Sequence, residues 1–330
     1  MAFGYVNRLM NNPSPKLISV VVPILNERGN LEAVCSRVEA VMSANLEGYD
    51  YEILFTDNHS SDGSFEELLK LSKTRPQVRA LRFSKNVGYQ LSILTGLLNA
   101  KGHVAIQLDA DLEDPPELIP KFIGEWEKGA KVVYGVRETR QEGSLQTFLR
   151  RSFYRILQRA SSDDIPVDAG DFRLIDRCVL DQLTRVKDPK PYLRGIIAAF
   201  GFEQVGIPYE RSKREWGESK FPYRAMIGLA IDGFLNHSDI PLKLATRIGI
   251  LISVSSFFLG VVYLVGKLVF QQQWAAGFAT TTILILLSLG IISMLLGIIG
   301  EYLSRIYTVT RGYPTVVVEK EITPGKASSE

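Results

Sequence analysis

The chain has 330 residues, which is enough for one large domain and a smaller part. Its 38 basic and 36 acidic side chains nearly balance, so the composition gives no sign of a broad basic surface for nucleic acid. Two cysteines and three scattered histidines exclude a disulfide framework and a cysteine-spaced zinc site, and they argue against a multi-histidine metal site.

Residues 1–16 contain no apolar run ahead of a cleavage site, and we expect a flexible lead-in there instead of a signal peptide. After them, short β-branched apolar runs alternate with helical patterns. The runs are nearly continuous, as in strands covered on both faces, and they are Leu17–Pro23, Tyr51–Thr56, Val78–Phe83, His103–Leu108 and Lys131–Val136. The helical patterns are Leu31–Ala44, Phe65–Ser72, Gln90–Ala100 and Pro116–Lys128. This alternation predicts an α/β fold with a doubly wound, mainly parallel sheet.

In such a sheet, ligands bind beyond the carboxyl ends of the strands, and unusual polar residues follow the strands here. Asn26 and Glu27 in "PILNE" come after the first strand, and Asp57 comes directly after the second. Asp62 and Ser64 in the same loop as Asp57 fit a capping turn before a helix. Asp57 has no such structural explanation, so we expect it to face the crevice.

The fourth strand ends in "LDADLEDPPE", Leu108–Glu117, which holds five carboxylates. No Gly-rich phosphate-binding motif occurs in the chain, so a bound diphosphate needs another counter-charge. Asp109 and Asp111 leave the strand two residues apart and can share a hard cation such as Mg²⁺ or Mn²⁺, which would then hold the diphosphate. Glu113 is a candidate for a further ligand. Asp114 and Glu117 are expected to cap the following helix.

The carboxyl-terminal third is apolar. Between Ile248 and Gly300 the only charged residue is Lys267, and the two apolar segments, about 247–269 and 277–303, are each long enough to cross a bilayer. We expect a transmembrane hairpin over 245–305, preceded by amphipathic interfacial helices over 222–244. The alternative, a buried helical hairpin in a soluble core, is disfavoured because soluble helices of this length keep a polar stripe.

Basic residues set the expected orientation of this hairpin. They gather at the end of the hairpin where both chain ends lie, and they are Lys243, Arg247, Arg305 and Arg311. The positive-inside rule then places the domain of residues 17–221, the tail 306–330 and both termini in the cytosol.

The ordered set of motifs resembles family 2 glycosyltransferases of the GT-A (Rossmann-like) fold. The similarity is to their polyprenyl-phosphate branch, which includes dolichyl-phosphate mannose synthase and bacterial undecaprenyl-phosphate glycosyltransferases. It extends over about Leu17 to Tyr313 and rests on "VVVPILNE", "DNHSSDGS", "KNVGYQ", "LDADLEDPPELIP", "GVR", "DAGDFRL", "RGIIAAFGF" and "REWGESK", followed by two apolar segments. A lone D-x-D motif would be weak, whereas this ordered set is specific.

The resemblance implies roles for particular residues. The nucleotide-binding residues would be Pro23, Asn26, Glu27, Asp57, Asp109, Arg214 and Lys220, with Asp57 facing the base. The metal ligands would be Asp109, Asp111 and Glu113, with Asp111 the surer ligand. The catalytic group would be Asp111, Arg137, Arg151, Asp171 and Arg173. Three positions depart from the family: Glu113 replaces a frequent Gln, Asn58 replaces a second aspartate, and "NHS" at 236–238 replaces "SFS".

The chemistry implied is sugar transfer, with inversion, from a nucleotide diphosphate sugar to a polyprenyl phosphate. A phosphate monoester has its second pKa near about 6, so at neutral pH it is a ready nucleophile that needs cationic positioning more than a strong base. By family position Arg137 and Arg151 would hold the lipid phosphate, and Arg214 would reach the donor diphosphate. Asp171 would orient the acceptor or act as a base.

Our functional prediction is glucose transfer from UDP-glucose to undecaprenyl phosphate in a bacterial inner (plasma) membrane, for modification of a cell-envelope glycan. N-acetylglucosamine, mannose and a modified 4-amino-4-deoxyarabinose fit the same frame, and a homo-oligomer stays open. A dehalogenase-like phosphatase would need its nucleophile after the first strand, and a processive polysaccharide synthase would need Q-x-x-R-W. A non-catalytic, membrane-anchored sugar-nucleotide binder is the remaining alternative, and the D-x-D pair argues against it.

Overall fold

The computed structural model describes residues 15–137, 169–189, 191–210 and 277–323, with isolated helical positions between 249 and 269. These residues belong to two compact units. The first holds the described residues up to 210 together with 314–323, and the second holds those from 249 to 313. Of the expected lead-in, residues 1–16, the first fourteen lie outside the described residues, and Lys16 already belongs to a strand. The expected interfacial helices of 222–244 also lie outside the described residues.

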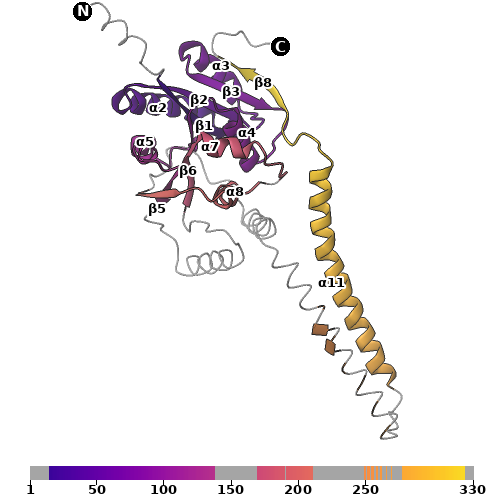
Figure 1. The fold of residues 1–330 in the computed structure, drawn as a ribbon. Helices are drawn as coiled ribbons and strands as arrows, with labels where there is room; N and C mark the ends of the chain where they lie inside the picture. Colours follow the sequence, from indigo (N-terminus) through magenta and orange to yellow (C-terminus); the bar gives the residue numbers. More distant parts are fainter. Residues whose placement is uncertain are drawn as a thin grey trace, which may run out of the picture. The chain divides into compact units, whose positions relative to one another are not determined.

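The first unit alternates strands and helices (Figure 1). Its elements are β1 (Lys16–Ile24), η1 (Arg28–Asn30), α2 (Leu31–Asn45), β2 (Tyr49–Asp57), α3 (Ser64–Thr74), β3 (Val78–Phe83), α4 (Tyr89–Asn99), β4 (Val104–Gln107), η2 (Pro116–Leu118), α5 (Ile119–Glu127), β5 (Val132–Arg137), β6 (Ala169–Asp176), α7 (Arg177–Leu183), α8 (Leu193–Ala199), β7 (Gln204–Tyr209) and β8 (Val318–Ile322). The five predicted strands and the four predicted helices are all confirmed, with ends that differ by at most three residues.

The strands form one eight-stranded mixed sheet in the order β7-β5-β6-β4-β1-β2-β3-β8. β1 pairs in parallel with β2 and β4, β2 with β3, and β5 with β7. β6 runs antiparallel to β4 and β5, and β8 runs antiparallel to β3. The prediction of a mainly parallel sheet is therefore confirmed for six strands, and the two reversed strands were not predicted.

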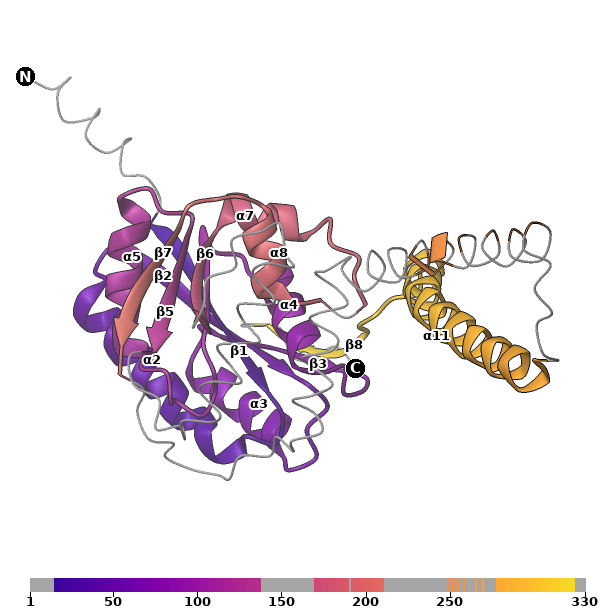
Figure 2. The same ribbon diagram turned by 90° about the horizontal axis from the view of Figure 1, so that it is seen from below.

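Both faces of the sheet are covered by helices, which explains why the strand sequences are continuous apolar runs. Ile18, Val20 and Val22 of β1 belong to a core cluster with side chains from α2, α3 and α5. Val21, which points to the other face, belongs to a second cluster with α4, α7 and α8. Figure 2 shows these two groups of helices on opposite faces.

The reversed strand β6 matters most for the site. Because it runs antiparallel to its neighbours, its first residues lie at the edge where β4 and β5 end: Arg173 is opposite Gln107, and Ala169 is opposite Val136. Asp171 is therefore brought to the edge at which the acidic run leaves β4.

The second unit contains α11 (Phe278–Thr310), a helix of 33 residues that includes the predicted second span. Its window Leu287–Ser304 is long and apolar enough to cross a membrane, and none of that window is buried; in the part of the chain that the structure describes, it is the one such helix. The predicted first span, 247–269, falls mostly outside the described residues, so the two-span hairpin stays a prediction. Beyond α11 the chain returns to the first unit as β8, within the segment expected to be a tail.

Candidate functional site

The candidate residues gather along one edge of the sheet, where β1, β2, β4 and β5 end and β6 begins. They form two groups. One surrounds Asp109 and Asp171, and the other surrounds Asp57 in the loops after β1 and β2. β1 lies between β4 and β2 in the sheet, so both groups lie along the same edge.

Asp109 follows β4 and is held by a tyrosine that the sequence did not single out. The Tyr89 hydroxyl, at the start of α4, donates a hydrogen bond of 2.6 Å to Asp109 Oδ1, and Gln107 Nε2 donates to the same hydroxyl at 3.1 Å. Burial, followed by the nearby charge of Asp114, raises the pKa of Asp109 to about 7, with smaller contributions from Asp171 and Asp111. Burial and the neighbouring carboxylates therefore disfavour the ionised form of Asp109 unless a positive charge lies nearby.

Asp111 and Glu113 lie on the loop that follows, and both are partly exposed. The Glu113 backbone N–H donates to Asp111 Oδ1 at 3.2 Å. Between them Leu112 has a φ of 54° although it is not glycine and is 2 % exposed, so the loop turns sharply here. Among the described residues, no three acidic, histidine or cysteine side chains are arranged as ligands of one metal ion.

Asp171 forms a two-pronged ion pair with Arg194 at the start of α8. Arg194 Nε lies 2.7 Å from Asp171 Oδ1, and Arg194 Nη2 lies 2.8 Å from Oδ2. Burial alone would raise the pKa of Asp171, but the adjacent Arg194 charge and its hydrogen bonds hold that pKa below its ordinary value. Asp171 is thus ionised, and both of its carboxylate oxygens accept hydrogen bonds from Arg194.

Arg137, at the end of β5, is held between two neighbouring groups. Its Nη2 lies 3.3 Å from both carboxylate oxygens of Asp114, and its Nε donates to the Tyr209 hydroxyl of β7 at 3.2 Å. The Tyr209 hydroxyl also donates to Asp114. The expectation that Asp114 caps the following helix is wrong, because η2 has no side-chain cap and the strand partners take the carboxylate. Glu117, expected in the same role, pairs with Arg37 at 2.7 Å.

Arg173 of β6 is buried, and its hydrogen bonding is incomplete. Its Nη2 donates to the backbone oxygen of Gly170 at 3.0 Å, whereas its Nε has no hydrogen-bond partner among the described residues. Burial lowers the pKa of Arg173 to about 10. A buried guanidinium with an unused N–H is a ready donor to an anionic oxygen.

The loops after β1 and β2 are joined by short hydrogen bonds. The Asn26 N–H donates to Ser60 Oγ at 2.9 Å, and the Ser61 N–H donates to Asn26 Oδ1 at 2.8 Å. Glu27 Oε2 accepts from Asn30 Nδ2 at 2.6 Å. Asn26 has a φ of 58°, a conformation that asparagine tolerates better than most residues. Pro23 lies within β1, opposite Thr56.

Asp57 ends β2; it was expected to face the crevice, but its carboxylate is fully buried and held by groups of the protein. One carboxylate oxygen accepts the Ser60 N–H at 2.9 Å, and the other lies 3.1 Å from Arg82 Nη1. The capping turn expected at Asp62 and Ser64 is confirmed, since Asp62 Oδ1 accepts the Ser64 N–H at 3.0 Å.

The structure thus brings Asp109, Asp111, Arg137, Asp171 and Arg173 to one part of the sheet edge. Arg151, Arg214 and Lys220 lie outside the described residues. Four partner residues escaped the sequence reasoning: Tyr89, Arg194, Tyr209 and Arg82. Tyr89 and Arg194 belong to the motifs "KNVGYQ" and "RGIIAAFGF", so membership in these motifs was the signal that could have identified them.

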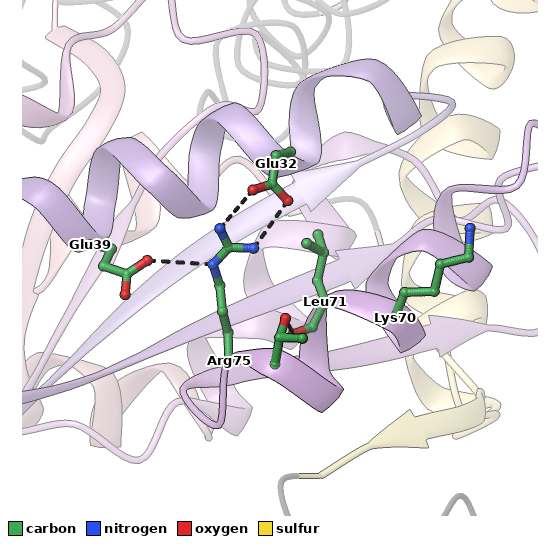
Figure 3. Close-up of a pocket in the computed structure, with 6 residues that line it drawn as sticks. Glu32, Glu39, Lys70, Leu71 and Arg75 are labelled. Carbon is green, nitrogen blue, oxygen red and sulfur yellow. Dashed lines mark hydrogen bonds and ion pairs between the residues drawn. The ribbon is translucent and has the colours of Figure 1, made fainter.

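An open pocket of about 510 Å³ lies elsewhere, between α2 and α3 (Figure 3). Its central group is Arg75, which lies 2.7 Å from Glu32 and 3.4 Å from Glu39. None of its lining residues is a predicted site residue, and the arginine is already neutralised by two carboxylates. The sheet edge, and not this pocket, is therefore the candidate functional site.

Known proteins resemble this chain along most of its length. Residues 19–184 match the profile of Glycosyl transferase family 2. An uncharacterized glycosyltransferase of Bacillus subtilis is 40% identical over 92% of this chain and 93% of its own length. A prophage-derived bactoprenol glucosyl transferase of Shigella flexneri is 31% identical over 92% of this chain and 97% of its own length.

Among solved structures, a mannosyltransferase of Pyrobaculum calidifontis, in complex with GDP-Man and Mn²⁺, aligns with a TM-score of 0.45 at 17% identity. The alignment covers 71% of this chain and 69% of that one. The family match spans half of the chain, and full-length relatives reach 40% identity. The chain belongs to glycosyl transferase family 2 and is a glycosyltransferase.

Proposed function

We propose that this glycosyltransferase moves glucose from UDP-glucose to a polyprenyl phosphate, undecaprenyl phosphate in particular, with inversion at the sugar carbon. Relatives of Shigella flexneri and of a Shigella phage that align over nearly their whole length are named bactoprenol glucosyl transferases, which supports glucose as the sugar and a polyprenyl carrier as the acceptor. The long apolar helix α11 supports a lipid acceptor, because it gives the chain a segment that can enter a bilayer.

The observation that carries the proposal is the mixture of charges at the edge of the sheet. Asp109, Asp171 and Asp114 gather there with Arg137 and Arg194, so the site offers both carboxylates and guanidinium groups. A reaction between two phosphate-bearing substrates needs such a site, because cations must offset the repulsion between the diphosphate and the phosphate.

On the donor side, Asp109 and Asp111 suit a divalent cation, Mg²⁺ or Mn²⁺, by their chemistry, although among the described residues they form no three-ligand cluster with Glu113. Asp109 and Asp111 would hold it, and Glu113 is the further candidate. They offer only oxygen ligands, as these hard ions prefer, and the crowding that raises the pKa of Asp109 to about 7 would be relieved by a positive charge. When bound, the cation would neutralise the donor diphosphate. Asn26, Glu27 and Asp57 would line the nucleoside pocket, as the family resemblance implies.

On the acceptor side, Arg137, Arg173 and the undescribed Arg151 would position the lipid phosphate. Arg173 suits this role because its buried Nε–H has no partner among the described residues. We assign Asp171 to orientation and not to proton transfer. Its pKa is lowered, its oxygens are on Arg194, and a phosphate dianion needs no base to become a nucleophile.

The experiment incubates purified full-length protein with undecaprenyl phosphate and a panel of radiolabelled nucleotide sugars, with Mg²⁺, Mn²⁺ or EDTA. We expect label to enter the lipid fraction from UDP-glucose, and EDTA to abolish the transfer. Asp111→Asn should lose at least about 10²-fold in rate. Asp181→Asn, which removes one carboxylate from an exposed position of α7, is the matched control and should keep the wild-type rate.

Each part of the proposal can fail separately. Label transferred only from another nucleotide sugar would overturn the choice of glucose. Full turnover in EDTA would overturn the metal. No transfer from any donor, with nucleotide binding intact, would favour a binding protein. We further propose two spans with the catalytic unit cytosolic in a bacterial inner membrane, and the labelling of single introduced cysteines in intact cells by an impermeant reagent tests that topology.

A further inference from the structure

The carboxyl-terminal strand β8 covers an edge of the sheet that would otherwise be open. It pairs antiparallel with β3, and the Ser84 N–H donates to the backbone oxygen of Val317 at 3.0 Å. Ile322 is 4 % exposed and joins the main core, and Val316 packs against the cluster that contains Phe83. The segment after α11 is therefore an integral part of the first unit.

β8 is also irregular at one position. Arg82 is opposite Lys320, and Phe83 is opposite Val318, so Glu319 is an extra residue on β8. Such a bulge changes the direction of a side chain. Glu319 Oε2 lies 3.8 Å from Arg82 Nε, whereas Glu321, two residues later, lies 3.4 Å from Arg79.

Arg82 continues this contact into the loop after β2. Its Nη1 lies 3.1 Å from Asp57 Oδ2, and its Nη2 donates to the backbone oxygen of Ser60 at 3.1 Å. Ser60 in turn accepts the Asn26 N–H through its hydroxyl. An unbroken set of contacts thus leads from Glu319 to the loops that we assign to the nucleoside.

The burial along this path increases inward. The side chains of Glu319, Arg82 and Asp57 are 44%, 17% and 0% exposed. Asp57 cannot be fixed by solvent, so its position depends on Arg82 and on the Ser60 N–H. The Nη1 and Nη2 groups of Arg82 contact Asp57 and Ser60, and Glu319 lies 3.8 Å from its Nε.

We propose that β8 is part of the donor-nucleotide site, with Glu319 as a positioning residue that holds Arg82 against Asp57 and Ser60. This rests on the proposed function, in which Asp57 lines the nucleoside pocket. Because β8 begins eight residues after α11 ends, the strand that completes the pocket is joined closely in sequence to the apolar helix. Donor binding then depends on the chain that returns from α11.

The test compares Glu319→Gln with Glu321→Gln in the full-length protein. Both variants remove one carboxylate from β8, but Glu321 contacts Arg79, which keeps its buried partner Glu52 at 2.6 Å. The readouts are the Kd for UDP by calorimetry, with Mn²⁺ present, and the KM values for donor and acceptor. For Glu319→Gln we expect the UDP Kd and the donor KM to rise two- to five-fold, the range for a partly exposed ion pair. The acceptor KM should not change, and Glu321→Gln should match the wild type.

A coupling experiment separates positioning from general damage to the sheet. If Glu319 acts through Arg82, then Glu319→Gln should have no further effect on the UDP Kd in an Arg82→Gln background. The effect of Glu319→Gln should also shrink in 0.5 M salt, at which exposed charges are screened. An equal effect in both backgrounds, or an unchanged UDP Kd in Glu319→Gln, would overturn the inference. Wild-type protein that binds no UDP would instead overturn the proposed donor, and this inference with it.

Discussion

The ion pair between Asp171 and Arg194 gives the sharpest prediction for the candidate site. We consider Arg194→Gln, which removes the charge and the two-pronged contact while keeping a polar, shorter side chain. The two side chains are 17% and 21% exposed, so the pair is mostly but not fully buried. Breaking a fully buried pair costs about 3–5 kcal/mol, and an exposed pair is worth about 0.2–1 kcal/mol. We therefore expect a loss of about 2–3 kcal/mol for Arg194→Gln.

The same chain offers a matched control. Arg37 and Glu117 form a second two-pronged pair, at 2.7–3.1 Å, whose side chains are 29% and 56% exposed. Arg37→Gln should lose less than about 1 kcal/mol. For a domain of about 200 residues, each kcal/mol shifts Tm by about 2–4 °C, so Arg194→Gln should lower Tm by about 4–12 °C. Thermal unfolding of the detergent-solubilised variants, followed by tryptophan fluorescence, measures both shifts.

Two further measurements identify the cause of the Arg194→Gln effect. Because Arg194 holds the pKa of Asp171 below its ordinary value, this stability is present above the unfolded pKa of about 3.9 and is lost as the pH falls further. The difference between variant and wild type should therefore shrink in acid. The double variant Asp171→Asn/Arg194→Gln should be less destabilised than the sum of the single variants, because no charge is left unpaired. Equal Tm shifts for Arg194→Gln and Arg37→Gln, or strict additivity, would refute the reasoning.

Three other predictions concern packing, acid stability and the site. Gly102→Ala should destabilise by about 1–3 kcal/mol in thermal unfolding, because the new Cβ would lie 2.5–2.8 Å from backbone atoms; Gly124→Ala, with nothing within 4 Å, should be neutral or slightly stabilising. Asp176→Asn should lower the free energy of unfolding by about 2 kcal/mol at pH 7 and by little near pH 2. Partial burial alone would raise the pKa of Asp176, but hydrogen bonds outweigh it and lower that pKa to about 2. Tyr89→Phe should reduce kcat/KM about five- to thirty-fold, as Asp109 loses a 2.6 Å hydrogen bond. An unchanged kcat/KM would contradict that role.

The sequence was sufficient to predict the strands whose residues form a continuous apolar run. β1 is buried from Ile18 to Ile24 on both faces, so its sequence shows no alternation of apolar and polar residues. By contrast, β8 reads "VEKEI", and only Ile322 in it is buried. A strand of this kind forms because β3 offers an unpaired edge, which is a property of the assembled sheet and not of the five residues.

The same distinction applies to the site. The rule that ligands bind beyond strand ends predicted that Asp57 and Asp109 lie along one edge of the sheet, and the structure has both residues at that edge. It could not supply the partners, because Arg194 is 23 residues from Asp171 in the chain and its helical neighbours do not indicate a carboxylate. Asp114 shows the opposite error: its position before two prolines indicates a cap, and tertiary contact with Arg137 overrides that local preference.

Backbone strain gives an independent reason to place the function at this edge. In the part of the chain that the structure describes, the non-glycine residues with positive φ are Asn26, His59 and Leu112, and they follow β1, β2 and β4. Such conformations cost of order 1–3 kcal/mol each and persist where the surroundings enforce them, often at functional sites. Leu112 has no polar side chain to stabilise its backbone, so its burial between the loop and the core must offset the cost. A loop that only connected β4 to η2 would have no need of that conformation, whereas the proposed function, in which Asp109 and Asp111 share one cation, gives a reason for it.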